Sequence, residues 1–224
     1  VISGADPVGN WKPYKGSILQ TKVPKVLDPG FNQVFLNGRM MHQARFPNET
    51  STDLHRPTCI KMSASDSRIT SPLLTQPDGF WNGGLVIGLF GHRWTSQCAQ
   101  IKDYRAGTLS LVEKSQPWYQ EAGQGYVSGV LGALDAPGEW HLEDGRLYFW
   151  PPDGTDMTSA RVEVKRRTLC IDYNGRSHVE IKGINVTTGS VRLIYSSHFT
   201  YFTWGGMAAD GGVDKGHNGI LVQG

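Results

Sequence analysis

The feature that most constrains the fold is a repeat of about twenty residues within residues 161–224. Short runs of β-branched and aromatic residues recur there, and each run ends at Gly, Asn, Ser or Asp. Two tripeptides occupy equivalent positions 20 residues apart, Ser177-His178-Val179 and Ser197-His198-Phe199. A repeated strand-rich unit of this length is typical of a β-solenoid, in which each coil buries its inner side chains by stacking on its neighbours. The repeat therefore predicts parallel β-helix coils.

The pattern also predicts where the chain leaves this solenoid and where it returns. Residues 1–8 are an apolar run broken at Pro7 and Gly9, as expected for one strand of an upstream coil. Residues 9–160 interrupt the repeat and residues 161–224 resume it, which predicts an inserted, mainly antiparallel β-domain at 9–160. The last repeat is incomplete at Gly224, so we expect further coils beyond this sequence.

Two hairpins in the insertion can be assigned residue by residue, because Asn-Gly and Asp-Gly accept positive φ at both positions of a two-residue turn. The turn Asn37-Gly38 predicts that Phe35 lies opposite Met40. The turn Asp144-Gly145 predicts four cross-strand pairs, which are Trp140 with Phe149, His141 with Tyr148, Leu142 with Leu147, and Glu143 with Arg146. The face that carries Trp140 and Leu142 is expected to be core.

The rest of the insertion has weaker patterns. Residues 49–79 are polar and rich in Ser, Thr, Asp and Pro, which predicts long loops with one short strand near residues 58–62. Residues 84–90 predict a buried strand whose glycines mark a close approach of another backbone or ring. The glycine-spaced residues 123–132 predict a turn region.

Charge and composition exclude several classes of partner. The 22 basic and 20 acidic residues leave a formal charge of +2, so no bulk field would recruit nucleic acid or a membrane surface. No apolar run approaches the ~18 residues that a membrane span requires. Three cysteines without a C-x-x-C pair argue against a zinc site, while a disulfide between Cys59 and Cys98 stays open for an oxidising compartment. We expect no bound metal and no cofactor.

Several motifs of the insertion and its junctions support a resemblance that covers nearly the whole chain. They are VISGAD (1–6), VFLNGR (34–39) leading to ARFPN (44–48), and APGEW (136–140) leading to GRLYFWPP (145–152). With these motifs the chain resembles secreted right-handed parallel β-helix carbohydrate-active enzymes, glycoside hydrolases and polysaccharide lyases, that carry a β-sandwich-like insertion in their first coils. The resemblance implies a polysaccharide or oligosaccharide partner and a secreted, periplasmic or cell-surface location. Arg39, Arg45 and Glu139 are expected to be ion-paired junction residues.

Candidate site residues lie in and beside the glycine-rich segment 205–216. A glycosidase needs two carboxyl groups across the scissile bond, and Asp210 and Asp214 are the candidate pair, with His217 as a further catalytic candidate. The alternative is that these aspartates only satisfy the backbone of a turn. The candidate substrate-binding residues are Trp204 and Tyr201, whose rings can stack on sugar faces, and Lys215.

We therefore expect this chain to be part of a polysaccharide-degrading β-helix enzyme, with hydrolysis favoured over elimination. In such enzymes the catalytic groove lies in coils further along the chain, so the resemblance implies that residues 1–224 are inactive alone. A polysaccharide lyase of the same fold is one alternative, and it would admit a calcium ion as cofactor. A non-catalytic glycan-binding or adhesive surface module is the other.

Overall fold

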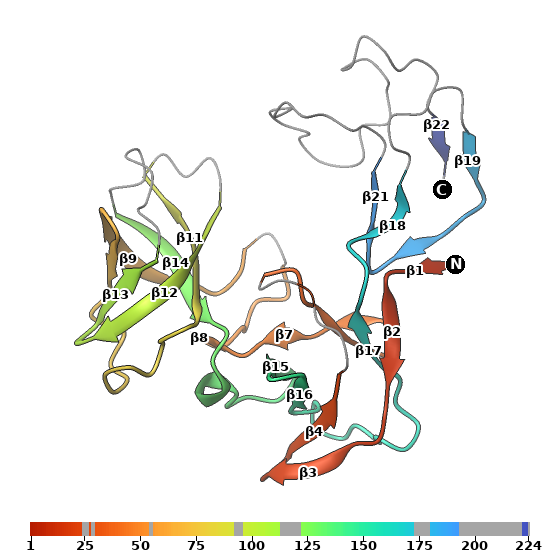
Figure 1. The fold of residues 1–224 in the computed structure, drawn as a ribbon, viewed down its shortest axis with the longest axis horizontal. Coiled ribbons are helices and arrows are strands. Elements are labelled where there is room, and N and C mark those ends of the chain that lie inside the picture. The colour runs from red at the N-terminus through yellow and green to blue at the C-terminus, as the bar shows by residue number, and fades with distance from the viewer. Residues whose placement is uncertain are drawn as a thin grey trace. The chain divides into compact units, whose positions relative to one another are not determined.

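The computed structural model describes residues 1–23, 27, 30–53, 56–91, 96–112, 122–172, 180–192 and 221–223. In this part of the chain nearly all regular structure is β, with one short 3₁₀ helix, η2 (Leu131–Ala133). The chain divides into two compact units, Val1–Pro7 with Val26–Asn32 and Glu163–Gly224, and Val8–Lys25 with Gln33–Val162 (Figure 1). The predicted all-β class is confirmed.

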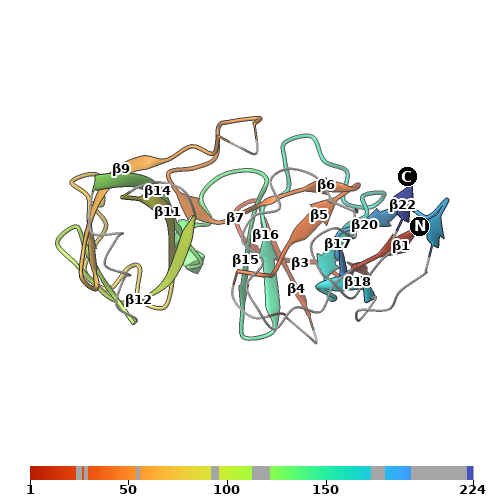
Figure 2. The ribbon, with the colours of Figure 1, turned by 90° about the horizontal axis from the view of Figure 1, so that it is seen from above.

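The larger unit contains a closed six-stranded antiparallel barrel. Its strands are β9 (Ile60–Ser65), β10 (Arg68–Thr70), β11 (Leu85–Phe90), β12 (Gln97–Arg105), β13 (Thr108–Leu111) and β14 (Ala122–Ser128). They pair in the order β11-β12-β13-β10-β9-β14, and β14 pairs again with β11, which closes the ring. Figures 1 and 2 show these strands from two directions. The antiparallel pairing agrees with the prediction, but the closed ring differs from the sandwich-like arrangement that the resemblance implied.

Glycines make this closure sterically feasible. A Cβ on Gly125 would collide with the carbonyl oxygen of Ile87, and one on Gly123 would collide with that of Leu89. A Cβ on Gly88 would lie 2.8 Å from the carbonyl oxygen of Gln124. The absence of side chains therefore lets β11 and β14 approach closely. The prediction of a turn at residues 123–132 was wrong for β14, because these glycines serve a strand contact.

The segment predicted as long loops also contains more structure than expected. Residues 60–70 form the hairpin β9–β10, in which Ser65 lies opposite Arg68 and Ala64 opposite Ile69. Asp66 takes a positive φ of 49° at the turn. The sequence pattern did not indicate this hairpin, because the outward-facing half of the residues in β9 is polar.

The barrel interior is the main hydrophobic core. Its largest fully buried side chains include Trp81, Tyr104, Ile101 and Leu109. The indole N–H of Trp81 donates to Gln76 Oε1 at 3.0 Å, and the hydroxyl of Tyr104 donates to the Leu74 carbonyl at 2.9 Å. Both aromatic residues therefore bury their rings without leaving a polar atom unpaired.

A separate five-stranded sheet belongs to the same unit. Its order is β3 (Lys12–Lys15), β4 (Ile18–Lys22), β16 (Arg146–Phe149), β15 (Glu139–Glu143) and β7 (His42–Gln43). The four predicted pairs around Asp144-Gly145 are all present, and the two turn residues have φ of 49° and 69°. The hairpin β5 (Val34–Leu36) and β6 (Arg39–Met40) also has the predicted register, with Phe35 opposite Met40.

The expected core face of the β15–β16 hairpin is confirmed, but the opposite face is buried as well. Trp140 and Phe149 are buried as predicted, but His141 and Tyr148 on the opposite face are buried as well, at 3% and 9% exposure. Tyr14 packs edge-on against Tyr148 with ring centroids 4.8 Å apart. Tyr148 also belongs to the main hydrophobic core, so this face is buried by tertiary packing, which a local hairpin pattern does not indicate.

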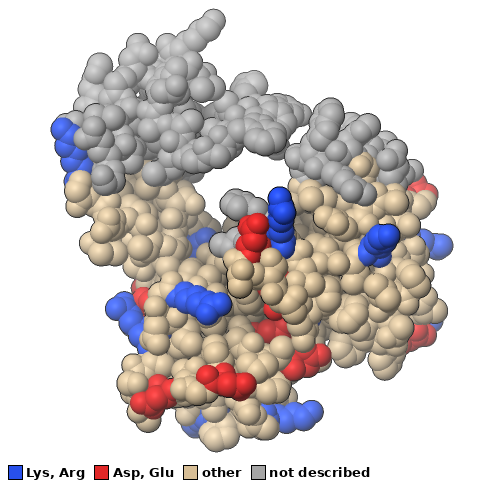
Figure 3. All heavy atoms as spheres, turned by 180° about the vertical axis from the view of Figure 1, so that it is seen from behind, with Lys and Arg blue, Asp and Glu red and all other residues tan. Residues whose placement is uncertain are grey.

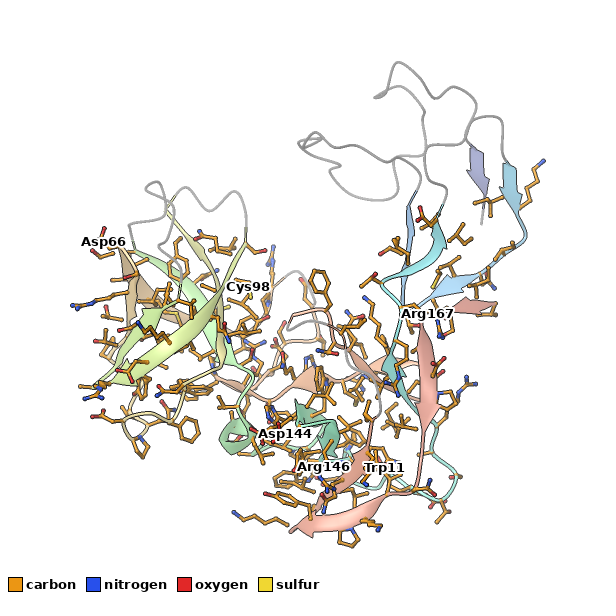
Figure 4. All side chains as sticks on the ribbon, in the orientation of Figure 1. Trp11, Asp66, Cys98, Asp144, Arg146 and Arg167 are labelled. Atoms are coloured by element: carbon orange, nitrogen blue, oxygen red, sulfur yellow. The ribbon has the colours of Figure 1, made fainter. Side chains whose placement is uncertain are left out.

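The smaller unit contains parallel pairs of strands. They are β1 (Ile2–Ser3) with β20 (Val186–Thr187), β18 (Leu169–Asp172) with β21 (Ser190–Arg192), and β19 (Glu180–Lys182) with β22 (Leu221–Gln223). β2 (Ala5–Val8) lies beside β17 (Val162–Lys165). Arg167, labelled in Figure 4, forms an ion pair with Asp6. The described residues do not show a right-handed parallel β-helix, and the division into residues 1–8, 9–160 and 161–224 remains a prediction.

Candidate functional site

The site residues predicted from the sequence lie outside the described residues. This applies to the catalytic candidates Asp210, Asp214 and His217 and to the substrate-binding candidates Trp204, Tyr201 and Lys215. Their roles therefore remain predictions. The candidate site that the described residues do contain is on the outer face of the barrel, which the sequence patterns had not suggested.

The site is a hollow of about 530 Å³ over strands β11 and β14. Its described lining residues are Arg56, Pro57, Cys59, Ile87, Gly88, Leu89, Ser96, Gln124 and Tyr126. The volume falls within the ~300–1,000 Å³ range of small-molecule sites. Ile87 lies opposite Tyr126 and Leu89 opposite Gln124 across the two strands. Since Val86 and Val127 point into the barrel core, the alternation places these two pairs on the outer face.

A buried ion pair supports the aromatic wall of the hollow. The guanidinium of Arg45 lies 3.6 Å from the centroid of the Tyr126 ring, and its Nη1 donates to Glu49 Oε2 at 2.7 Å. The side chains of Arg45 and Glu49 are only 5% and 6% exposed. Arg45 also donates to the carbonyl oxygen of Thr58. Stacked and charge-assisted contacts of this kind hold a planar guanidinium and its partners in one geometry.

The carboxyl of Glu49 stays ionised at neutral pH. Burial alone would raise the pKa of its carboxyl, but hydrogen bonds from Thr58 and Ser51, together with the charge of Arg45, outweigh burial and lower the pKa to about 2. Its Oε1 accepts from the Thr58 hydroxyl at 2.7 Å, the Thr58 amide at 3.0 Å and the Ser51 amide at 2.9 Å. The ion pair therefore fixes Thr58, which lies between two lining residues of the hollow, relative to the Tyr126 ring.

Glu139 has the opposite electrostatic environment. It is 3% exposed, and its Oε2 accepts the amides of Asp135 and Ala136 at 3.3 Å each, while its Oε1 has no hydrogen-bond partner among the described groups. Burial raises the pKa of this carboxyl to about 7. Neither Glu139 nor Glu49 is among the described lining residues of the hollow.

The expected junction roles are met in part. Arg45 is ion-paired, as expected, whereas the carboxyl of Glu139 accepts backbone amides. His141 is a further buried group, and burial lowers its pKa to about 4, so it is neutral near pH 7. Within the described ranges no group of three or more His, Cys, Asp or Glu side chains could hold a metal ion.

The strand register explains why Cys59 and Cys98 are not joined. Cys98 on β12 lies opposite Ile87, and Ile87 lies opposite Tyr126 (Figure 4 labels Cys98). Cys59 immediately precedes the residue that begins β9 on the far side of β14. Three strand steps separate the two cysteines, which is half of the six-stranded ring, so they lie on opposite sides of the barrel, whereas a disulfide needs Cα atoms within about 7 Å. Both thiols are free.

The face shown in Figure 3 has no dominant charge among its described residues. On the face shown in Figure 3, basic and acidic side chains are interspersed, in agreement with the formal charge of +2. Among the described residues, no helix combines the length and apolar character needed to cross a bilayer.

Comparisons with known proteins place the fold but not the activity. No family model matches the chain, and no curated protein matches its sequence. A solved structure described as a glycoside hydrolase is similar, with a TM-score of 0.62 and 17% sequence identity. The match covers 84% of this chain and 36% of that chain, so this sequence spans little more than a third of the hydrolase. At this identity the likeness concerns the fold alone.

Proposed function

We propose that this chain is part of a glycan-processing protein built like a glycoside hydrolase, and that the hollow on its barrel contacts the glycan. The observation that carries the proposal is the combination of an aromatic wall, Tyr126, with an apolar floor, Ile87 and Leu89. Sugar rings present C–H faces that pack against aromatic and apolar groups, while their hydroxyls require hydrogen bonds.

The polar residues of the hollow are suited to those hydroxyls. Gln124 and Ser96 supply donors and acceptors, and Arg56 supplies donors only. The stack on Arg45 holds the Tyr126 ring in place before a ligand arrives. An aromatic wall that is already ordered loses less conformational freedom on binding, which improves affinity.

The finer assignment is hydrolysis of a polysaccharide by a secreted protein with a parallel β-helix. The parallel pairs β18–β21 and β19–β22 and the likeness to a glycoside hydrolase support it. We place the catalytic groove in the β-helix coils, with Asp210, Asp214 and His217 as its candidates within this sequence. A lyase or a non-catalytic glycan-binding module would use the same barrel hollow without Asp210 and Asp214 as a catalytic pair.

The proposal is tested with the protein that contains this chain. Glycan binding is measured by calorimetry over a polysaccharide panel, alongside release of reducing sugar and ultraviolet absorbance of unsaturated products. Tyr126→Ala should weaken binding about tenfold or more, as for other central aromatic contacts. Tyr14→Ala is the matched control, because Tyr14 is an exposed tyrosine on β3, away from the hollow.

Each outcome decides a different point. Equal affinity of Tyr126→Ala and wild type would refute the hollow as a glycan contact, provided that thermal unfolding shows both variants folded. Reducing sugar without unsaturated product supports hydrolysis, the reverse supports a lyase, and binding without either product supports a binding module.

A further inference from the structure

A second hollow adjoins the first on the outer surface of the barrel. It has a volume of about 490 Å³. Its described lining residues are Lys61, Met62, Ser63, Thr70, Pro72, Ala122, Gly123 and Gln124. Gln124 lines both hollows, so they meet at this residue of β14.

The strand register gives the extent of the combined surface. Thr70 of β10 lies opposite Ser63 of β9, and Ser63 lies opposite Ala122 of β14. In the neighbouring row, Lys61 lies opposite Gln124, which lies opposite Leu89 of β11. The two hollows thus follow the curved outer surface over four of the six barrel strands, about 14 Å along the sheet at the usual strand spacing. A surface of this length suits a chain of linked sugars better than a single ring.

The charged residues of this surface have one sign. Lys61 lines one hollow and Arg56 the other, and no carboxylate is among the described lining residues of either. Arg56 is 88% exposed and its Nε is 3.9 Å from Asp53, so this ion pair is loose and solvated. Lys61 has no ion pair among the described groups.

The backbone of Lys61 is fixed on β9 by a buried hydrogen bond, while its side chain is exposed. The hydroxyl of Ser71, which is 3% exposed, donates to the Lys61 carbonyl oxygen at 2.8 Å. The nearby Arg45 adds no net field, because Glu49 neutralises it. The surface therefore combines Lys61, which has no ion pair among the described groups, and Arg56, whose ion pair is loose, with a polar residue between the hollows and an aromatic wall at one end.

We propose that the two hollows form one binding surface for a linear anionic glycan. Lys61 and Arg56 pair with carboxylate or sulfate groups at separate positions along the glycan, Gln124 hydrogen-bonds where the hollows meet, and Tyr126 packs on a ring. The inference rests on the proposed glycan-related function and adds to it the charge and the extended form of the ligand. Arginine is well suited to a planar carboxylate or sulfate, because its guanidinium can donate two parallel hydrogen bonds.

The test compares charged and neutral versions of one glycan. The full protein is titrated with polygalacturonate and with its methyl ester, and separately with dextran sulfate and dextran. The charged form should bind more tightly in at least one of the two series, and that series identifies carboxylate or sulfate as the group recognised. Raising the salt from 50 to 500 mM should weaken the binding of the charged form only, since salt screens exposed charges.

Two variants and a control locate the effect. Lys61→Gln and Arg56→Gln should each weaken binding of the charged glycan about threefold, and together about tenfold, as expected for exposed ion pairs. Lys12→Gln removes an exposed lysine of β3 and should leave the affinity unchanged. Thermal unfolding checks that all variants are folded.

The outcomes separate this inference from the proposed function. Equal binding of charged and neutral glycans, or equal effects of Lys12→Gln and Lys61→Gln, overturns the anionic-glycan surface. If neutral glycans bind and Tyr126→Ala abolishes that binding while Lys61→Gln does not, the proposed function stands and the inference fails. If no glycan binds to the wild type, both fail.

Discussion

The buried carboxyl of Glu139 should make the stability of this protein depend on pH between about 5 and 8. Burial raises its pKa from an ordinary value of 4.5 to about 7. The folded state therefore binds this proton more tightly than the unfolded chain does. The stability is fully present below pH 4.5 and is lost as the pH rises through 7.

The magnitude follows from the same two values. Because one pKa unit corresponds to about 1.4 kcal/mol, the ionised carboxyl costs the folded state about 3 kcal/mol at high pH. Glu139→Gln keeps an oxygen that can accept the amides of Asp135 and Ala136 but cannot ionise. Between pH 5 and pH 8, the free energy of unfolding of this variant should rise by about 2 to 3 kcal/mol relative to that of the wild type.

The assay is urea unfolding at pH 5 and pH 8, monitored by tryptophan fluorescence. Glu143→Gln is the matched control, because Glu143 is an exposed glutamate on the same strand. This control should show the wild-type pH dependence. If Glu139→Gln and wild type lose stability in parallel between the two pH values, the carboxyl ionises normally in the folded state and the reasoning is refuted.

Three further predictions concern the barrel and the hairpin. Glu49→Gln leaves the cation of Arg45 buried without its partner and should destabilise the fold by about 3 to 5 kcal/mol in urea unfolding. In the wild type, the stability that ionised Glu49 contributes should be lost as the pH falls from 4.5 through about 2, because the pKa of Glu49 is lowered in the folded state. Gly125→Ala drives a methyl group into the carbonyl of Ile87 and should cost about 1 to 3 kcal/mol, with a lower Tm by calorimetry; an unchanged Tm would show that the barrel can relax there. Gly145→Ala places a side chain at a φ of 69° and should cost about 1 kcal/mol in the same assay, and no loss would contradict the type I′ turn.

Local chemistry explains which parts of the fold could be predicted. The turns at Asn37-Gly38 and Asp144-Gly145 depend on two residues and their immediate neighbours, so the register of both hairpins followed from the sequence. The strand β14 did not, because Gly123 and Gly125 are required by the distant strand β11. A glycine needed for a tertiary contact has the same appearance in the sequence as a glycine needed for a turn.

The candidate site was missed for the same reason. The alternation Gly123-Gln124-Gly125-Tyr126 has period two, with glycines inward and the polar and aromatic residues outward, and that period was the available signal for both the strand and the site. Arg56 could not have been predicted, because only the three-dimensional fold brings it to the same hollow as Gln124 and Tyr126. The sequence-predicted candidates at residues 201–217 rest on the repeat pattern and the resemblance.

The exposed strand β3 affects whether copies of this protein can pair edge to edge. All four of its residues are exposed, and it forms one edge of the five-stranded sheet. Pro13 lacks the amide that would donate to an added strand, while Lys12 and Lys15 would bring like charges together if two copies met there. The barrel, as a closed ring, has no such edge along β11 and β14. Edge-to-edge aggregation is therefore disfavoured at both places.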